Sequence, residues 1–213
     1  MNSLEVLFRN KKLVEVPDGK IVVYEGHEVN KIYRVNSGYI KVYTVTGAGT
    51  QRILFMYKSG DVFPLTTFLS GQSVTRFFYE SLTPTTLQSI TPRQLENKLR
   101  NNLQLGEEII RYTSYLDRQF LDRINNIVSN KDPRAKINAA LFFLCNRISS
   151  RSNMIHINFP VNAKFIASMC GVSSKEASKQ IKLLKSEGII TLNDGVIIDK
   201  KALKTFPLST NRT

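Results

Sequence analysis

The feature that most constrains the fold is a series of short strand-like segments separated by glycine-containing turns. Between residues 14 and 87, apolar and polar residues alternate as they do in strands with one buried face. Four turns interrupt this pattern at hairpin spacing: Pro17-Asp18-Gly19, Asn36-Ser37-Gly38, Gly47-Ala48-Gly49 and Ser59-Gly60-Asp61. Short strands at this spacing predict an all-β roll or barrel for the N-terminal part of the chain.

A long helix is predicted after the strands. The segment from Glu107 to Val128 contains neither glycine nor proline, and as a helix it would be ~33 Å long. Its apolar residues recur every three or four positions and form one stripe: Ile109, Tyr112, Leu116, Phe120, Ile124 and Ile127. We expect this stripe to pair with a second copy in a homodimer, although the same spacing also fits a helix packed within its own domain.

The C-terminal part carries most of the positive charge. The whole chain has a formal net charge of +13, and residues 131–213 hold fourteen Lys and Arg against five Asp and Glu, a net of +9. Asp132 and Pro133 fit the cap and first position of a new helix and mark a boundary. The charge points to an acidic partner for this region, with nucleic acid considered before a membrane surface.

Two helices joined by a sharp turn are predicted within this basic region. Asn162 can cap the first helix, Gly171 suits the bend, and Ser173 with Glu176 forms a capping box for the second. Seven residues of the second helix fall on one ~140° arc without an acid. They are Ser174, Lys175, Ser178, Lys179, Lys182, Lys185 and Ser186. This pattern predicts a helix-turn-helix with a basic reading face.

A hairpin is predicted directly after these helices. Residues 189–192 and 196–198 are apolar and β-branched, and Asn193-Asp194-Gly195 lies between them. Asp-Gly between two such runs is a strong hairpin signal. The hairpin would make the C-terminal part a winged helix-turn-helix.

Both halves of the sequence resemble the Crp/Fnr transcription regulators. In the N-terminal half the resemblance rests on residues 32–43 and 57–63, and in the C-terminal half on residues 169–176 and 181–185. It implies an α+β chain with three parts: a sensor domain (residues 1–104) that is a cyclic-nucleotide-binding-like jelly roll, a dimerisation helix (105–131) and a DNA-binding winged helix-turn-helix (132–213). It also implies that Ser173, Ser174, Lys175, Ser178, Lys179, Lys182 and Lys185 contact double-stranded DNA.

The sequence departs from this family in the ligand site of the roll. Members that bind cyclic AMP carry a Gly-Glu pair and an Arg-Ser or Arg-Thr pair, where this chain has Pro64-Leu65 and Val74-Thr75. The sugar-binding acid and the phosphate arginine are therefore missing from those positions, and we expect no control by cyclic AMP. An apolar pocket at Phe63, Leu65, Val74 and Thr75 is the expected place for an effector, which remains unidentified.

Other functions are less consistent with the composition. The chain has two histidines and two cysteines, His27, His156, Cys145 and Cys170, so we expect no metal, no cofactor and no catalytic site. The cysteines are expected to be reduced core residues of a cytoplasmic protein without a membrane segment. RNA polymerase is a candidate partner. The alternative hypothesis is a small-ligand sensor whose basic half binds another nucleic acid such as RNA.

Overall fold

The computed structural model describes residues 3–149, 151–192 and 196–204. Two compact units make up the chain. The first comprises Met1–Val45 and Ile53–Arg118, and the second comprises Thr46–Arg52 and Gln119–Thr213. The division falls inside the longest helix, which therefore contributes residues to both units.

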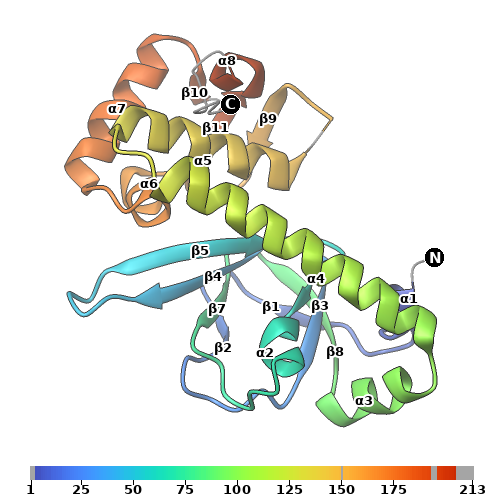
Figure 1. Cartoon of the computed structure of the whole chain (residues 1–213). Helices are drawn as coiled ribbons and strands as arrows, with labels where there is room; N and C mark the ends of the chain where they lie inside the picture. Colours follow the sequence, from blue (N-terminus) through green and yellow to red (C-terminus); the bar gives the residue numbers. More distant parts are fainter. Residues whose placement is uncertain (1–2, 150, 193–195, 205–213) are drawn as a thin grey trace, which may run out of the picture. The chain divides into compact units, whose positions relative to one another are not determined.

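The first unit contains two four-stranded sheets, as the alternating pattern predicts (Figure 1). One sheet has the order β1-β8-β3-β6, with β1 at Val14–Val16, β8 at Thr85–Ile90, β3 at Ile32–Ser37 and β6 at Val62–Phe63. The other has the order β2-β7-β4-β5, with β2 at Ile21–Val23, β7 at Phe78–Ser81, β4 at Ile40–Val45 and β5 at Gln51–Tyr57. The β-roll prediction is confirmed.

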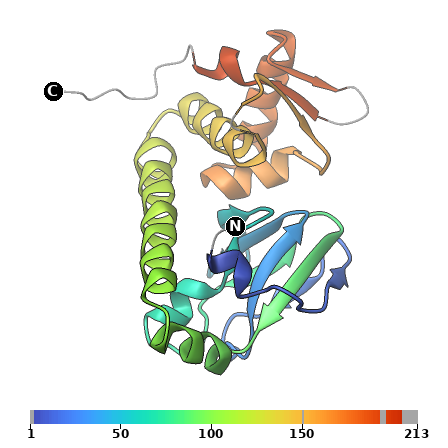
Figure 2. The ribbon, with the colours of Figure 1, turned by 90° about the vertical axis from the view of Figure 1, so that its right-hand side faces the viewer.

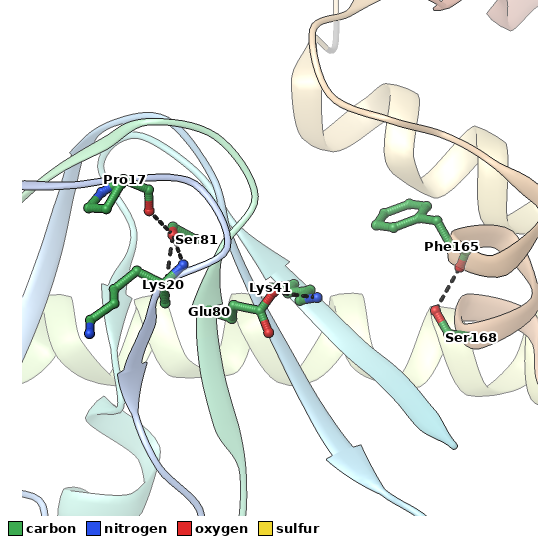
Figure 3. Close-up of polar contacts among 7 residues, drawn as sticks. All are labelled: Pro17, Lys20, Lys41, Glu80, Ser81, Phe165 and Ser168. Carbon is green, nitrogen blue, oxygen red and sulfur yellow. Dashed lines mark hydrogen bonds and ion pairs between the residues drawn. The ribbon is translucent and has the colours of Figure 1, made fainter. Parts of the chain in front are cut away.

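Polar contacts hold the strands of the second of these sheets together. Ser81 Oγ donates to the carbonyl of Pro17 at 2.5 Å and accepts from the amide of Lys20 at 3.0 Å, which ties the first turn to the end of β7 (Figure 3). Lys41 and Glu80 lie opposite each other on β4 and β7 and form an ion pair of 2.8 Å. Both contacts fix the register of β7 against its neighbours.

Three short helices accompany the roll: α1 at Ser3–Val6, α2 at Leu65–Leu69 and α3 at Pro92–Arg100. They share one core with strand residues and with the beginning of the long helix: Leu4, Phe8, Ile32, Val62, Leu65, Ile90, Leu95, Leu105 and Ile109. The start of α3 is well specified, because Thr91 and Gln94 form a capping box and Pro92 takes the first helical turn. The sequence pattern did not predict α1 and α2, since helices of four and five residues are too short for a helical period to appear.

The long helix α4 runs from Leu103 to Arg123. It begins four residues earlier than predicted and includes Gly106, because the side chain of Asn102 accepts a hydrogen bond from the Leu105 amide at 3.0 Å and so caps this end. A single π-helical turn, η1 at Ile124–Val128, continues it. The pattern of apolar residues gave no indication of this wider turn.

The second unit combines helices with a small sheet (Figure 2). Its helices are α5 at Pro133–Ile148, α6 at Ala163–Cys170, α7 at Ser174–Ser186 and α8 at Lys200–Lys204. Its sheet has the order β10-β11-β9, with β10 at Ile190–Leu192, β11 at Val196–Asp199 and β9 at Met154–Ile157. The Asp132 carboxylate accepts from the amides of Arg134 and Ala135, which confirms the predicted cap of α5. The α+β class is confirmed.

Candidate nucleic-acid interface

Helix α6 ends in the sharp bend that the sequence predicts. Asn162 Oδ1 caps its start by accepting from the Phe165 amide at 2.9 Å, and Ser168 Oγ donates to the Phe165 carbonyl at 2.8 Å within the helix (Figure 3). Gly171 follows the last residue with φ of +68°, in the left-handed region that glycine adopts without a steric cost. The turn therefore directs the chain into a second helix.

Helix α7 is capped by Ser173, whose Oγ accepts from the Glu176 amide at 3.1 Å. The second half of the predicted capping box is wrong. The Glu176 carboxylate accepts a hydrogen bond from Gln180 Nε2 at 2.8 Å, one helical turn further along. Because these two side chains are four residues apart, they are neighbours on the helix surface.

The two faces of α7 differ in burial and in charge. Ala177, Gln180 and Leu184 are buried against the rest of the second unit. Ser178 is half-buried, and the other predicted contact residues are exposed. They are Ser173, Ser174, Lys175, Lys179, Lys182 and Lys185. Within the described ranges, none of the four lysines takes part in an ion pair. The helix thus presents a row of uncompensated positive charges with small hydroxyl groups between them.

A buried arginine fixes the end of α6. Arg123, from the last turn of α4, donates to the Met169 carbonyl at 2.5 Å, and its guanidinium lies 5.7 Å from the ring centre of Phe143. Burial lowers the pKa of Arg123 to about 10, so the side chain remains charged at neutral pH. The sequence pattern does not predict this positioning residue, because arginine is rarely buried.

Both cysteines are buried and unoxidised, Cys145 in α5 and Cys170 at the end of α6. Burial raises the pKa of each thiol to about 12. A protonated, inaccessible thiol is a packing residue. No cluster of metal-binding side chains is found in the described part of the chain.

The predicted hairpin is present as β10 and β11, which pair antiparallel, with Ile190 opposite Ile198 and Leu192 opposite Val196. Its turn at Asn193-Asp194-Gly195 lies outside the described residues. Strand β9 pairs with the other edge of β11 and was not predicted, because only Ile155 and Ile157 are buried in a segment of four residues. A two-helix motif followed by a small sheet is the arrangement of a winged helix-turn-helix.

Two models of known protein families match the chain in the same order as its domains. A model of the cyclic nucleotide-binding domain matches residues 13–102, and a model of the Crp-like helix-turn-helix domain matches residues 136–206. The chain belongs to the Crp/Fnr family. It is a transcription regulator of the Crp/Fnr type, with a roll followed by a DNA-binding domain.

Two curated relatives of this Crp/Fnr regulator are nitrogen regulators. It is 24% identical to the nitrogen fixation regulation protein FixK of Rhizobium meliloti (strain 1021), over 85% of this chain and 79% of FixK. It is 21% identical to the global nitrogen regulator of Nostoc sp., over 82% of this chain and 78% of that protein.

Solved structures share the fold at low sequence identity. FixK2 from Bradyrhizobium japonicum superposes with a TM-score of 0.76 at 18% identity, covering 92% of this chain and 96% of FixK2. A transcriptional regulator of the CRP family from Thermus thermophilus gives 0.72 at 19% identity, covering 90% of this chain and 95% of that one. These similarities support the fold of the Crp/Fnr regulator over both units.

Aromatic rings pack around Phe63 inside the roll. The ring of Phe63 stacks on those of Tyr33 and Tyr79 with centres 5.4 and 5.2 Å apart, and that of Tyr57 lies 5.5 Å away. Three of the four predicted pocket residues, Phe63, Leu65 and Thr75, are buried, whereas Val74 is exposed. Leu65 belongs to the core that the short helices share with the roll. The chain's own side chains therefore surround Phe63, one of the residues of the predicted effector pocket.

The exposed side of α4 differs from the predicted stripe. Ile109, Leu116 and Ile127 are buried, and the half-buried Tyr112 accepts a hydrogen bond from the Val62 amide at 2.8 Å. These four side chains thus pack within the chain, whereas Phe120 and Ile124 remain exposed. Dimerisation through the predicted stripe stays a prediction. A second set of exposed apolar side chains lies about 100° further round the helix. They are Leu103, Ile110 and Leu121, followed by Ile124 and Val128 after α4.

The described part of the Crp/Fnr regulator contains no helix that is both long and apolar enough to cross a membrane.

Proposed function

We propose that two copies of the chain bind a palindromic site on double-stranded DNA, with helix α7 of each copy in the major groove. The observation that carries this proposal is the exposed lysine and serine face of α7, placed directly after a capped turn. Residues near the start of a recognition helix contact base edges. We assign this role to Ser174, Lys175, Ser178 and Lys179, and phosphate contacts to Lys182 and Lys185.

Duplex DNA suits this surface better than duplex RNA. The major groove of B-form DNA is wide enough for an α-helix, whereas the major groove of A-form RNA is too narrow and deep for one. The reading side chains of α7 project from one face of a thirteen-residue helix. This geometry supports a helix inserted in a groove and gives no support to the alternative hypothesis, in which the basic half binds another nucleic acid such as RNA.

The homodimer is proposed to form along the exposed apolar ridge of α4, defined as Leu103, Ile110, Leu121, Ile124 and Val128. The apolar side chains of the ridge lie toward the two ends of the long helix, with Ser114 and Asp117 between Ile110 and Leu121. They suit pairing with an identical helix in a coiled coil. Crp-like regulators are typically dimeric, which supports the assignment. We further propose that the protein is cytoplasmic, has no enzymatic activity and contacts RNA polymerase when bound to DNA.

Cyclic AMP and cyclic GMP are expected not to bind. Leu65 and Val74 stand where the polar clamps of nucleotide-binding members lie, and aromatic rings pack around Phe63. Calorimetric titration should give no saturable heat, and the melting temperature should stay constant. Micromolar binding would contradict this expectation, because a ligand at 100 times its Kd adds ~2.7 kcal/mol to the free energy of unfolding.

Selection of bound sequences from random duplex DNA tests the proposed function. We expect an inverted repeat with half-site centres ~10 base pairs apart or a multiple of that spacing. A parallel selection from random RNA should enrich no sequence. Enrichment of RNA alone, or of DNA without two-fold symmetry, would overturn the proposal.

A further inference from the structure

A cavity of about 670 Å³ lies on the first unit, away from the roll interior and from α7. Its walls come from three segments: the end of α1 with the residues that follow it, the end of β8, and α3 with the linker to α4. This volume lies within the range of small-molecule sites, ~300–1,000 Å³. Nothing in the proposed DNA-binding function uses it.

The lining of this cavity carries positive charge without an acid. Arg9, Lys11 and Lys98 contribute three cationic side chains, and no Asp or Glu lines the cavity. In the part of the chain that the structure describes, none of the three forms an ion pair.

Nearby carboxylates are directed elsewhere. Glu5 Oε1 accepts from Arg34 at 3.2 Å, and Glu108 Oε2 accepts from the Leu4 amide at 3.1 Å. Both acids flank the N-terminal segment, yet each is engaged by a partner that does not line the cavity. These two acids therefore do not neutralise the positive charge of the cavity.

Amide side chains add hydrogen-bond donors to the same walls. Gln94, Asn97, Asn101 and Asn102 line the cavity. Two of them already use their oxygen in the fold: Gln94 Oε1 accepts from the Thr91 amide at 3.0 Å and Asn102 Oδ1 accepts from the Leu105 amide at 3.0 Å. An amide side chain has one oxygen and one NH₂ group. The side chains of Gln94 and Asn102 can therefore offer a ligand mainly the N–H donors of their NH₂ groups.

The segment that carries Arg9 and Lys11 is held in place. Gln88 Nε2, on β8, donates to the carbonyls of both Phe8 and Lys11 at 3.0 Å. Asn10, between the two cations, has φ of +62°, a left-handed conformation that costs energy for a residue with a side chain. The backbone that carries the two cations is thus held in place before any ligand arrives, which lowers the entropic cost of ordering this segment on binding.

We propose that this cavity binds a small organic anion that carries two or more phosphate or carboxylate groups. The cations and amide donors would bind its acidic groups, and Val6, Leu7 and Ile90 would contact its apolar part. The site lies beside α3 and just before the start of α4. A bound anion would therefore contact the segment from which the long helix begins.

The test titrates the full chain with pyrophosphate and with citrate at constant ionic strength, following binding heat and melting temperature. We expect saturable binding of at least one probe. Binding of pyrophosphate alone would indicate a phosphate ligand, and binding of citrate alone would indicate a carboxylate ligand. In Arg9→Gln/Lys98→Gln, affinity should fall about tenfold for each charged contact removed. The matched control Lys12→Gln/Arg93→Gln removes the same charge from the same segments, outside the cavity lining, and should bind as the unaltered chain does.

Three outcomes would overturn the proposal. The first is no saturable binding of either probe, and the second is equal weakening in both double variants, which would indicate a non-specific basic surface. The third concerns a glutamate-rich peptide titrated as a further probe. Binding of this peptide without binding of either small anion would assign the surface to an acidic protein partner. Affinity for DNA should be the same in both variants and in the unaltered chain, so failure here is distinguishable from failure of the DNA-binding proposal.

Discussion

The double variant Ile110→Glu/Leu121→Glu should be a monomer that has lost nearly all of its affinity for a palindromic duplex. Both side chains are exposed on the apolar ridge of α4, 65% and 64% respectively, so their replacement leaves the protomer's own core intact. When one protomer of a dimer is bound to its half-site, the other protomer is held close to the second half-site. A monomer lacks this advantage, so its affinity for the palindromic duplex should be about 10²- to 10⁴-fold weaker. Light scattering and titration of labelled duplex measure the two effects.

A control variant adds the same charge to another side of the helix. Gln104 and Tyr115 are exposed on α4 at least 100° away from every residue of the ridge, so Gln104→Glu/Tyr115→Glu should remain dimeric and bind DNA. A dimeric Ile110→Glu/Leu121→Glu protein would show that the ridge is not the interface. Leu116 is unsuitable for this test because it is buried, and a glutamate there would destabilise the fold itself.

Replacing Gly38 by alanine should strongly destabilise the first unit. Gly38 has φ of +86°, and an added Cβ would collide with Thr85 Oγ1 and lie 2.7 Å from the carbonyl oxygen of Pro84. The left-handed conformation costs ~1–2 kcal/mol and the steric overlap a further ~1–3 kcal/mol, so we expect a loss of about 2–5 kcal/mol in the free energy of unfolding.

Tyrosine fluorescence during urea denaturation measures this loss selectively, because all eight tyrosines lie between residues 24 and 115. The matched control is Gly26→Ala: Gly26 has φ of +79° but nothing within 4 Å of an added Cβ. Gly26→Ala should lower the free energy of unfolding only by the cost of the left-handed backbone conformation, ~1–2 kcal/mol. Equal losses in the two variants would mean that the turn after β3 does not pack as closely as the structure shows.

The sequence was most informative where a local physical rule decides the structure. Alternating residues with glycine turns predicted the roll, and the caps at Asp132, Asn162 and Ser173 predicted the starts of three helices. Each of these features depends on neighbours within a few residues. The exposed basic face of α7 was predictable for the same reason, since helical spacing alone separates it from Ala177 and Leu184.

Features that depend on distant contacts could not be predicted. The apolar stripe of α4 was identified, but its spacing cannot show that Ile109 packs against the roll core while Ile110 is exposed. The contact of Arg123 with the Met169 carbonyl joins residues 46 positions apart. The cavity beside Arg9 and Lys98 joins residues that are even further apart in the chain. Only a tertiary structure brings such groups together.

The central claim is that α7 reads duplex DNA, and the salt dependence of binding by single lysine variants tests it most directly. Lys179→Ala, Lys182→Ala and the control Lys12→Ala would be titrated against a selected site and a random duplex at several salt concentrations. Lys12 is exposed and belongs to the first unit, so its variant should bind DNA as the unaltered chain does.

We expect the two α7 variants to differ. Lys182→Ala should weaken binding to both duplexes about equally and reduce the slope of log affinity against log salt by ~1 per half-site, because a phosphate contact is lost. Lys179→Ala should lose ~1–3 kcal/mol on the selected site and relax base preference at one position of each half-site. Unchanged affinity and slope in both variants would contradict the account and would leave the lysine face of α7 as a solvated helix surface.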